Sequence, residues 1–596
     1  MIRGNFVSRT SAQCTAALVG CCWLAFVVGG CGRATNPGGA IAIGTGGVAG
    51  GGAMVPDSVG TGGATPVLVE SGSGRRLRRL SSREYNNVVR DLLGDTTRPA
   101  DAFIADSFQN GYDNGSAGLA VQSDQVESYQ LAAESLGVRA VAEQLPLLLD
   151  GCDPAVSGEG ACAQAFFQTF PARAFRRPLS DGELGRLRAV FDEAVAIEPD
   201  AAGDAAGFTL GLRTVIETIL QSPQFLYREE LGAVGTISGN PRQVRLTSFE
   251  VASELSFLLT GTMPDAPLFA AAAAGRLETS DDLRREARRL LGTAGAREVM
   301  RAFLHQWLAT DRLTETAKDL AIYPTFNLDL ARSMSTELNQ LFDAVVWNGT
   351  GTLRELFTTS RSFVDPALAS LYGVIGPSGG FAPVTLDATT RKGVLTRAGF
   401  LAAHADQDSS GPIARGVFVL NSVLCTAPLQ RPATVPVPPS VADATAGGKT
   451  TRQRFEQHAT DGQCTGCHRI IDGVGFAFEE FDAVGAFRAT ENGSPVDSSG
   501  RLYTTRDING TFVGASELAM RMVEGHDLPD CFVKQLYRFA MGEVESTSPA
   551  LLVALQDAFS VDVPVGELML ALVSDPLFVV RVTARDDVRD AMAGQP

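Results

Sequence analysis

A chain of 596 residues is too long for one hydrophobic core, because single cores stop growing at about 250–300 residues, and it suggests about three or four domains. Hydrophobic residues make up 45% of the chain and charged residues 20%, which is ordinary for globular protein. The formal net charge of -17 argues against nucleic acid as a partner, since phosphate binding needs a basic surface. We interpret the acidic balance as a solvated surface, which could also steer a basic redox partner.

Residues 1–31 predict a lipoprotein signal peptide. Arg3 and Arg9 precede the apolar stretch 16–28, which is too short for an ordinary membrane-spanning helix. Small residues then lead into Cys31, a pattern that resembles a bacterial lipobox in which this cysteine is lipidated. We therefore expect export and a lipid anchor in the outer membrane, on its periplasmic or surface face. The alternative is an ordinary secretory signal without lipid.

Residues 32–75 are rich in Gly, Ala, Thr and Ser and contain few large apolar side chains. Such a segment cannot bury enough surface to fold, so we expect a disordered tether between the anchor and the folded body.

The body has helical periodicity almost throughout. The segment 82–94 starts with a capping-type serine, Ser82, and stops at Gly94, while its apolar positions share one helical face. Similar patterns recur at 121–145, 180–197, 206–221, 248–260, 281–309, 328–347, 412–424, 515–541 and 546–573. Strand-like alternation is confined to short stretches, for instance 243–246 and 383–386. We predict a mostly α fold, a multi-domain helical array.

Changes of composition divide this array into modules. We place an N-terminal helical module at 76–150, a second at 151–231, a third at 232–385, a cytochrome c-like haem domain at 386–495 and a C-terminal helical module at 496–596. One weak internal similarity relates 220–228 to 572–581, and similar helix ends explain it as well as a true repeat.

Six cysteines remain after the signal peptide, and export would permit disulfides. Cys152 and Cys162 flank a short Gly-containing loop that they would readily close. If Cys464 and Cys467 bind a cofactor, Cys425 and Cys531 are the remaining pair, and a disulfide between these two would tie the C-terminal region to the cofactor region.

The chemistry-bearing motif is Cys464-Thr-Gly-Cys467-His468, the C-x-x-C-H pattern of covalent c-type haem attachment. Two thiols on one helical turn can bond the two vinyl groups of haem, and the adjacent histidine is then the proximal iron ligand. We therefore expect one covalent haem c. The apolar residues that follow the motif either line its pocket or form ordinary core: Ile470, Ile471, Val474, Phe476, Phe478 and Phe481. The acidic residues there more simply solvate a helix: Asp472, Glu479, Glu480 and Asp482.

The sixth iron position has several candidates. We favour His404 or His458 as the distal ligand, and the remaining candidates are His305, His526, Met520, Met522 and Met541. Two rival interpretations use the same motif: a zinc site that adds His458, and a thiol–disulfide redox pair. The first requires adjacent residues to bind one metal, and the second leaves His468 unexplained.

Two strings around the motif resemble the planctomycete cytochrome c domain family. The first runs from Arg391-Lys-Gly-Val-Leu-Thr-Arg-Ala-Gly-Phe-Leu through Ser409-Ser-Gly-Pro-Ile-Ala-Arg-Gly416 to Leu424-Cys425, and the second is Cys464-Thr-Gly-Cys-His-Arg-Ile-Ile-Asp-Gly-Val-Gly-Phe. In that family an Ile-Asp-Pro-x-Gly-Phe run follows the motif. Here Gly473 replaces the proline and Gly411 interrupts a usual Ser-Pro, but neither change touches the iron or thioether positions.

Further strings resemble the uncharacterised helical modules that accompany this domain in planctomycetes and myxobacteria. They are Ser82-Arg-Glu-Tyr-Asn-Asn-Val-Val-Arg-Asp-Leu-Leu-Gly, Arg173-Ala-Phe-Arg-Arg-Pro-Leu179, Leu220-Gln-Ser-Pro-Gln-Phe-Leu-Tyr-Arg and Leu255-Ser-Phe-Leu-Leu. The resemblance covers about 76–582 and implies a large secreted cytochrome-like protein, without implying a substrate.

These observations support three hypotheses. The first is a lipid-anchored monohaem protein that transfers electrons to or from a redox protein partner. The second is a haem enzyme of oxidase or peroxidase type with an open distal site. The third is a structural or binding surface lipoprotein.

Overall fold

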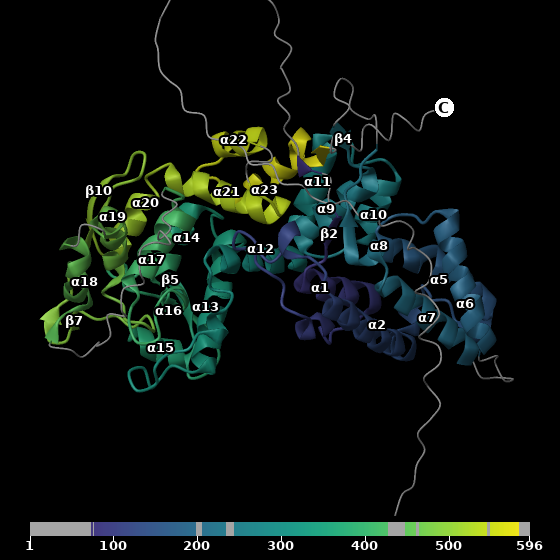
Figure 1. Ribbon diagram of the computed structural model, residues 1–596, viewed down its shortest axis with the longest axis horizontal. Helices are drawn as coiled ribbons and strands as arrows, with labels where there is room; N and C mark the ends of the chain where they lie inside the picture. The colour runs from purple at the N-terminus through teal and green to yellow at the C-terminus, as the bar shows by residue number, and fades with distance from the viewer. Residues whose placement is uncertain are drawn as a thin grey trace, which may run out of the picture. The chain divides into compact units, whose positions relative to one another are not determined.

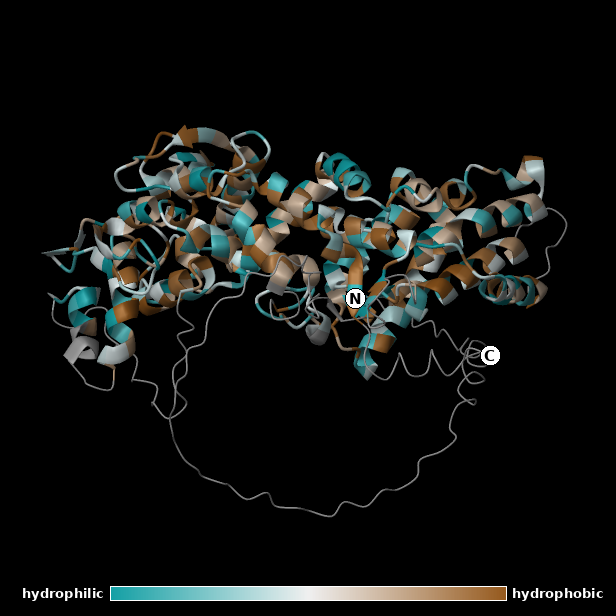
Figure 2. Ribbon diagram, turned by 90° about the horizontal axis from the view of Figure 1, so that it is seen from above, coloured by the Kyte–Doolittle hydropathy of each residue, from teal (hydrophilic) through white to brown (hydrophobic). Residues whose placement is uncertain are grey.

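The structure is a computed structural model that describes residues 73–74, 77–197, 206–233, 243–426, 448–460, 464–544 and 549–582. The predicted signal peptide with Cys31, and nearly all of the predicted tether, lie outside the described residues. The described residues belong to one compact unit, Leu68–Pro596. Helices dominate and strands are short (Figure 1), which confirms the predicted mostly α fold. Apolar and polar residues occur together on most helices (Figure 2), as expected of helices that bury one face. Within the described ranges, no helix is both long and apolar enough to cross a bilayer.

The N-terminal helices enclose their own apolar cluster, which includes Phe166, Phe170 and Leu212. These helices are α1 (Ser82–Leu93), α2 (Ser123–Glu143), α3 (Leu145–Leu148), α4 (Pro154–Ser157), α5 (Glu159–Phe175), α6 (Asp181–Ile197), α7 (Ala206–Leu220) and α8 (Pro223–Leu226). Both α2 and α6 pack against α7. Helix α1 starts one residue earlier than expected: Ser81, not Ser82, is the cap, because only Ser81 stands three residues before Glu84 and forms the reciprocal capping box.

The central helices carry the next part of the chain. They are α9 (Ser248–Thr260), α10 (Ala266–Ala273), α11 (Ser280–Leu291), α12 (Ala294–Trp307), α13 (Leu328–Val346), α14 (Leu353–Thr358) and α15 (Pro366–Tyr372). A two-stranded antiparallel ribbon of β5 (Arg361–Val364) and β6 (Ala382–Thr385) packs beside α13.

The C-terminal part holds the Cys-x-x-Cys-His motif. Its helices are α16 (Ala398–Ala403), α17 (Pro412–Phe418), the π-helical turn η5 (Val419–Val423), α18 (Thr451–Thr460), α19 (Thr465–Gly475), the 3-10 turn η7 (Phe476–Phe478), α20 (Gly514–Met522), α21 (Asp527–Met541), α22 (Pro549–Ala558) and α23 (Val565–Ser574). Its antiparallel strand pairs are β7 (Thr490–Glu491) with β8 (Ser494–Pro495), and β9 (Ser499–Leu502) with β10 (Gly510–Val513).

Short strands join segments that are far apart in the sequence. Strand β11 (Val580–Val582) pairs in parallel with β1 (Ser73–Gly74) and antiparallel with β4 (Gln243–Arg245). Strand β2 (Leu77–Arg79) pairs antiparallel with β3 (Tyr227–Glu229). The last described strand therefore closes onto the first and onto the central part of the chain.

The two similar sequence segments also form similar local structure. Each leaves a helix, α7 or α23, makes a short turn that begins with proline, α8 or η9 (Pro576–Val579), and enters a strand, β3 or β11. Each strand carries one arginine, Arg228 or Arg581, that is only 1% exposed. The similarity therefore extends to a buried guanidinium at the same position of both segments.

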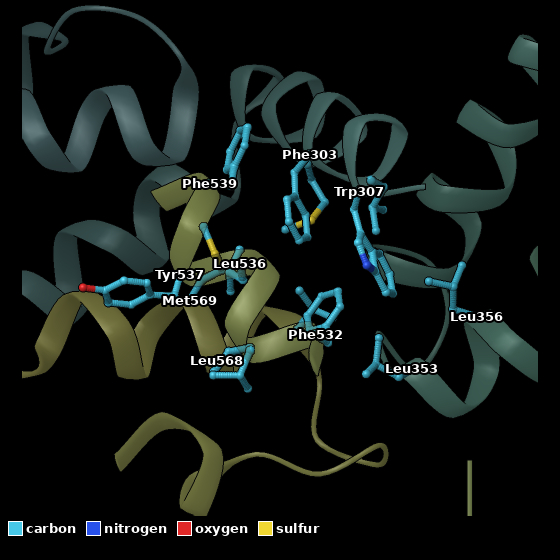
Figure 3. Packing of buried hydrophobic residues seen from close by; sticks show 14 of the residues in the cluster. Phe303, Trp307, Leu353, Leu356, Phe532, Leu536, Tyr537, Phe539, Leu568 and Met569 are labelled. Carbon is cyan, nitrogen blue, oxygen red and sulfur yellow. The ribbon is translucent and has the colours of Figure 1, made fainter. Parts of the chain in front are cut away.

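The largest apolar cluster crosses the expected module boundaries. Phe303 and Trp307 of α12 pack against Phe532 of α21, with ring centroids 5.6 and 5.0 Å apart. Leu568 and Met569 belong to the same cluster (Figure 3). Helices from the expected modules 232–385 and 496–596 therefore share one core.

Two disulfides crosslink the described part of the chain. One joins Cys152 to Cys162 and the other joins Cys425, after η5, to Cys531 on α21. Both are the pairs expected from the sequence, and the second closes a span of 106 residues.

Removing the longer crosslink with Cys425→Ser and Cys531→Ser is expected to lower the free energy of unfolding by about 5 kcal/mol, since a long loop regains much entropy in the unfolded chain. The matched pair Cys152→Ser and Cys162→Ser opens a span of only 10 residues, and its expected loss is about 3 kcal/mol. Guanidinium unfolding followed by circular dichroism measures both. Equal losses would contradict the assignment of a loop-closing role to Cys425–Cys531.

Candidate functional site

Helix α19 places the Cys-x-x-Cys-His motif on a single turn. Cys464 directly precedes the helix, and the backbone N–H of His468 donates to the Cys464 carbonyl at 3.0 Å. Cys464 and Cys467 take part in no disulfide, and Cys467 is exposed. Two thiols and one imidazole are thus carried by one turn of a helix.

Helix α17 crosses α19 so closely that the two backbones are in contact. A Cβ atom at Gly475 would lie 2.0 Å from the Pro412 carbonyl oxygen, and one at Gly416 would lie 2.5 Å from the Ile471 carbonyl oxygen. Only glycine fits at these two positions. The close crossing explains the glycine at position 416, which ends the Gly-Pro-Ile-Ala-Arg-Gly string before the motif.

Buried polar side chains then fix the turn after α19. Arg415 is fully buried and donates to the carbonyls of Phe478 and Phe481 at 3.2 and 3.1 Å. Burial lowers the pKa of Arg415 to about 10. Glu479, expected to solvate a helix, is instead only 1% exposed and accepts from the Ser410 hydroxyl at 2.7 Å. This burial could not be predicted from the sequence, since an acidic residue is normally exposed.

A cavity of about 670 Å³ lies against α19. Its walls come from α18, α19, β9, β10 and the residues beside them: Arg452, Phe455, Thr465, His468, Arg469, Asp472, Gly473, Phe476, Ser499, Gly500, Arg501, Tyr503, Thr511, Phe512, Val513 and Glu517. The β9–β10 pair follows residue 495, so one wall comes from beyond the expected haem domain.

Strand β9 lies directly on α19. A Cβ atom at Gly500 would be 1.9 Å from the Gly473 carbonyl oxygen, and one at Gly473 would be 2.9 Å from the Arg501 carbonyl oxygen. Gly473 stands where the resembled family has proline. In this chain the missing side chain lets the strand reach the helix and close the cavity.

His468 is oriented by Asp472, one helical turn later. Nδ1 of His468 lies 2.9 Å from Oδ1 of Asp472, and the two side chains are 19% and 11% exposed. A carboxylate can only accept, so the imidazole donates from Nδ1 and the ring then presents Nε2 as its basic nitrogen. This role of Asp472 differs from the helix-solvating role expected from the sequence, although its i, i+4 spacing from His468 on a helix was an available signal.

Cationic side chains surround the cavity of a strongly acidic chain. The guanidinium groups of Arg469 and Arg501 lie 5.2 and 5.3 Å from the ring centroid of Tyr503, and that of Arg452 lies 4.8 Å from Phe476. Arg469 and Arg501 have no carboxylate partner among the described residues. The cavity can therefore receive the anionic groups of a ligand.

Four family models match consecutive segments of the chain. They are PSD3 (DUF1587) at 78–142, PSD5 (DUF1595) at 162–230, PSD4 (DUF1592) at 246–374 and PSCyt3 (DUF1588) at 391–491, each described as a protein of unknown function. The chain carries these four planctomycete cytochrome c-associated domains. The match confirms the suspected family. No curated protein and no solved structure matches the chain.

The PSCyt3 match ends at residue 491, before β9 and β10. The structure divides the apolar residues that follow the motif between the two roles left open by the sequence, pocket lining and core. Of the six apolar residues that follow the motif, Phe476 lines the cavity, whereas Ile471, Val474, Phe478 and Phe481 are buried in the large core. Phe455 and Phe512 complete the aromatic lining.

The structure does not bring His404 to the cavity. Its Nε2 donates to the Leu308 carbonyl at 2.8 Å, and its ring packs between Phe400 and Phe418 at 4.5 and 4.0 Å. A spatially separate aromatic pocket therefore accounts for this histidine. The side chain of His458, on α18, lies outside the described residues.

The remaining candidates for the distal position are also engaged elsewhere. His305 is buried, with its ring nitrogens 2.8 Å from the Thr310 hydroxyl and 3.0 Å from Asn339. His526 is exposed and pairs with Asp507. The cavity lining does not include Met520, Met522 or Met541. In the described part of the chain, no three His, Cys, Asp or Glu side chains gather to hold a metal.

We expect the fold to lose stability in acid, because burial lowers the pKa of His404 to about 4 from its ordinary 6.5. The buried neutral ring makes its full contribution to the free energy of unfolding above pH 6.5. This contribution is lost as the pH falls from 6.5 toward 4, because in that range His404 binds a proton in the unfolded chain but not in the folded one. His404→Gln keeps an amide donor without titration, so it should remove about 3 kcal/mol of this acid loss. Urea unfolding at pH 7 and 4 tests this, with His526→Gln as the exposed control. An unchanged acid loss in His404→Gln would refute the assignment.

Proposed function

We propose that the chain is an exported, lipid-anchored, monohaem c-type cytochrome-like protein that transfers electrons. The observation that carries the proposal is the placement of Cys464, Cys467 and His468 on one helical turn beside a cavity of about 670 Å³. That volume lies within the range of about 300–1,000 Å³ that is usual for cofactor sites.

The residues present suit a haem. Cys464 and Cys467 would hold it through thioether bonds, and His468 would bind the iron. Phe455, Phe476 and Phe512 would contact the macrocycle, while Arg469 and Arg501 supply cations for its propionates. The bound group would supply one-electron chemistry of iron. The protein's own part is to orient His468 through Asp472 and to limit access of water with the β9–β10 pair.

The disulfides support export, which belongs to the same proposal. Covalent haem attachment and stable disulfides both belong to oxidising compartments, and the described residues contain two disulfides beside two unpaired motif thiols. Cys31 would supply the membrane anchor, and a redox protein would be the electron partner.

Coexpression with the cytochrome c maturation machinery tests the attachment. We expect haem staining that survives denaturing electrophoresis and about one haem per chain by pyridine haemochrome. Cys467→Ser should weaken or abolish the covalent stain, and His468→Ala should abolish the native haem spectrum. His526→Ala is the matched control, since its side chain is 78% exposed and does not line the cavity. Unchanged staining in Cys467→Ser would refute the attachment site, and a colourless wild-type protein would leave a structural or binding role.

A second function, a haem enzyme of oxidase or peroxidase type, is favoured by the composition of the lining. His468 is the sole histidine among the described lining residues, which include neither methionine nor cysteine. An iron without a second protein ligand could bind a small molecule.

Carbon monoxide separates the two functions. The second function predicts a five-coordinate ferrous protein whose Soret band shifts when carbon monoxide binds, because this function requires an open face opposite His468. A six-coordinate, low-spin spectrum that ignores carbon monoxide would exclude the enzyme and support electron transfer. Absorption spectra of the reduced wild-type protein decide the question, with a six-coordinate c-type cytochrome as the reference.

A further inference from the structure

The carboxylate of Asp472 contacts the motif histidine, and the motif's cofactor chemistry does not account for this carboxylate. Its Oδ1 lies 2.9 Å from Nδ1 of His468, it is only 8% exposed, and it lines the cavity. Within the described residues, no arginine pairs with Asp472, although three line the same cavity. Its negative charge is therefore directed at the imidazole.

The backbone around Asp472 is held on both sides. Strand β9 lies on the next residue, Gly473, and the preceding residue, Ile471, contacts α17 at Gly416. Contacts on both sides therefore hold the backbone that carries the carboxylate beside the ring.

We propose that Asp472 is a positioning residue that fixes the Nδ1–H form of His468 and holds the bound iron toward its oxidised state. The inference rests on the proposed function. A ligating imidazole that donates to a carboxylate is more basic than one that donates to a neutral acceptor. A more basic ligand stabilises ferric over ferrous iron and so lowers the reduction potential.

Spectroelectrochemical titration of the haem-loaded full-length protein tests the inference. Asp472→Asn keeps the size of the side chain and removes its charge, so the ratio of ferrous to ferric protein at a fixed potential should rise roughly tenfold, a shift of about 59 mV for one electron. Asp472→Glu keeps the carboxylate and should restore most of the wild-type value.

Glu517→Gln is the matched control. Glu517 lines the same cavity, but its carboxylate accepts from the Val513 N–H at 2.8 Å and is not bonded to His468. Removing this charge should move the midpoint far less than Asp472→Asn does. Equal shifts in the two variants would show general electrostatics and overturn the positioning role.

The outcomes separate the inference from the proposed function. Haem-loaded Asp472→Asn with the wild-type midpoint overturns the inference and leaves covalent haem intact. A wild-type protein without covalent haem overturns both. If Asp472→Asn fails to retain haem while Asp472→Glu retains it at the wild-type midpoint, the carboxylate is still assigned as the group that positions His468.

Discussion

The carboxylate of Glu254 lies between the guanidinium groups of Arg228 and Arg581, and the packing of the chain depends on this buried ion cluster. Glu84 of α1 lies 3.3 Å from Arg228, and Glu230 pairs with Arg581. Burial raises the pKa of Glu230 to about 7, so this site is costly for an unpaired charge. Buried charges must be paired, and these partners come from α1, β3, α9 and β11. The complete cluster forms only when the first, central and last parts of the chain meet.

That closure also shapes the candidate site. With β11 paired to β4, helix α21 packs Phe532 against α12 and is bonded to the end of η5 through Cys425–Cys531. The β9–β10 pair just before α20 and α21 then lies on α19 at Gly473. The cavity wall thus follows from tertiary packing beyond the PSCyt3 match, and the motif helix alone would leave this side of the histidine open to water.

The sequence predicts the features that depend on local pattern. Helical periodicity predicts the helices, and C-x-x-C-H spacing predicts one turn that carries two thiols and His468. The sequence does not predict that β9 forms a wall of the cavity. Its four residues, Ser-Gly-Arg-Leu, are too few and lack apolar alternation, and the strand is specified by its contact with Gly473. Nor does the sequence place His404, whose aromatic pocket is assembled from separate segments. The role of Asp472 was partly predictable: its i, i+4 spacing from His468 can be read in the sequence, but its burial cannot.

The charges of the cavity arginines and of Asp472 would have opposite effects on a bound iron, and distance and solvent screening decide which effect is larger. Arg469 and Arg501 would favour the reduced, less positive iron, but both are exposed, so water and salt screen their charges. In the proposed haem site, Asp472 would act through a hydrogen bond of 2.9 Å to the ring of His468, which is only 19% exposed, so that screening is weak. The arginines are therefore suited to hold carboxylates of a bound group, while the carboxylate behind His468 would have the stronger influence on a bound iron. A site built in this way separates retention of the cofactor from control of its oxidation state.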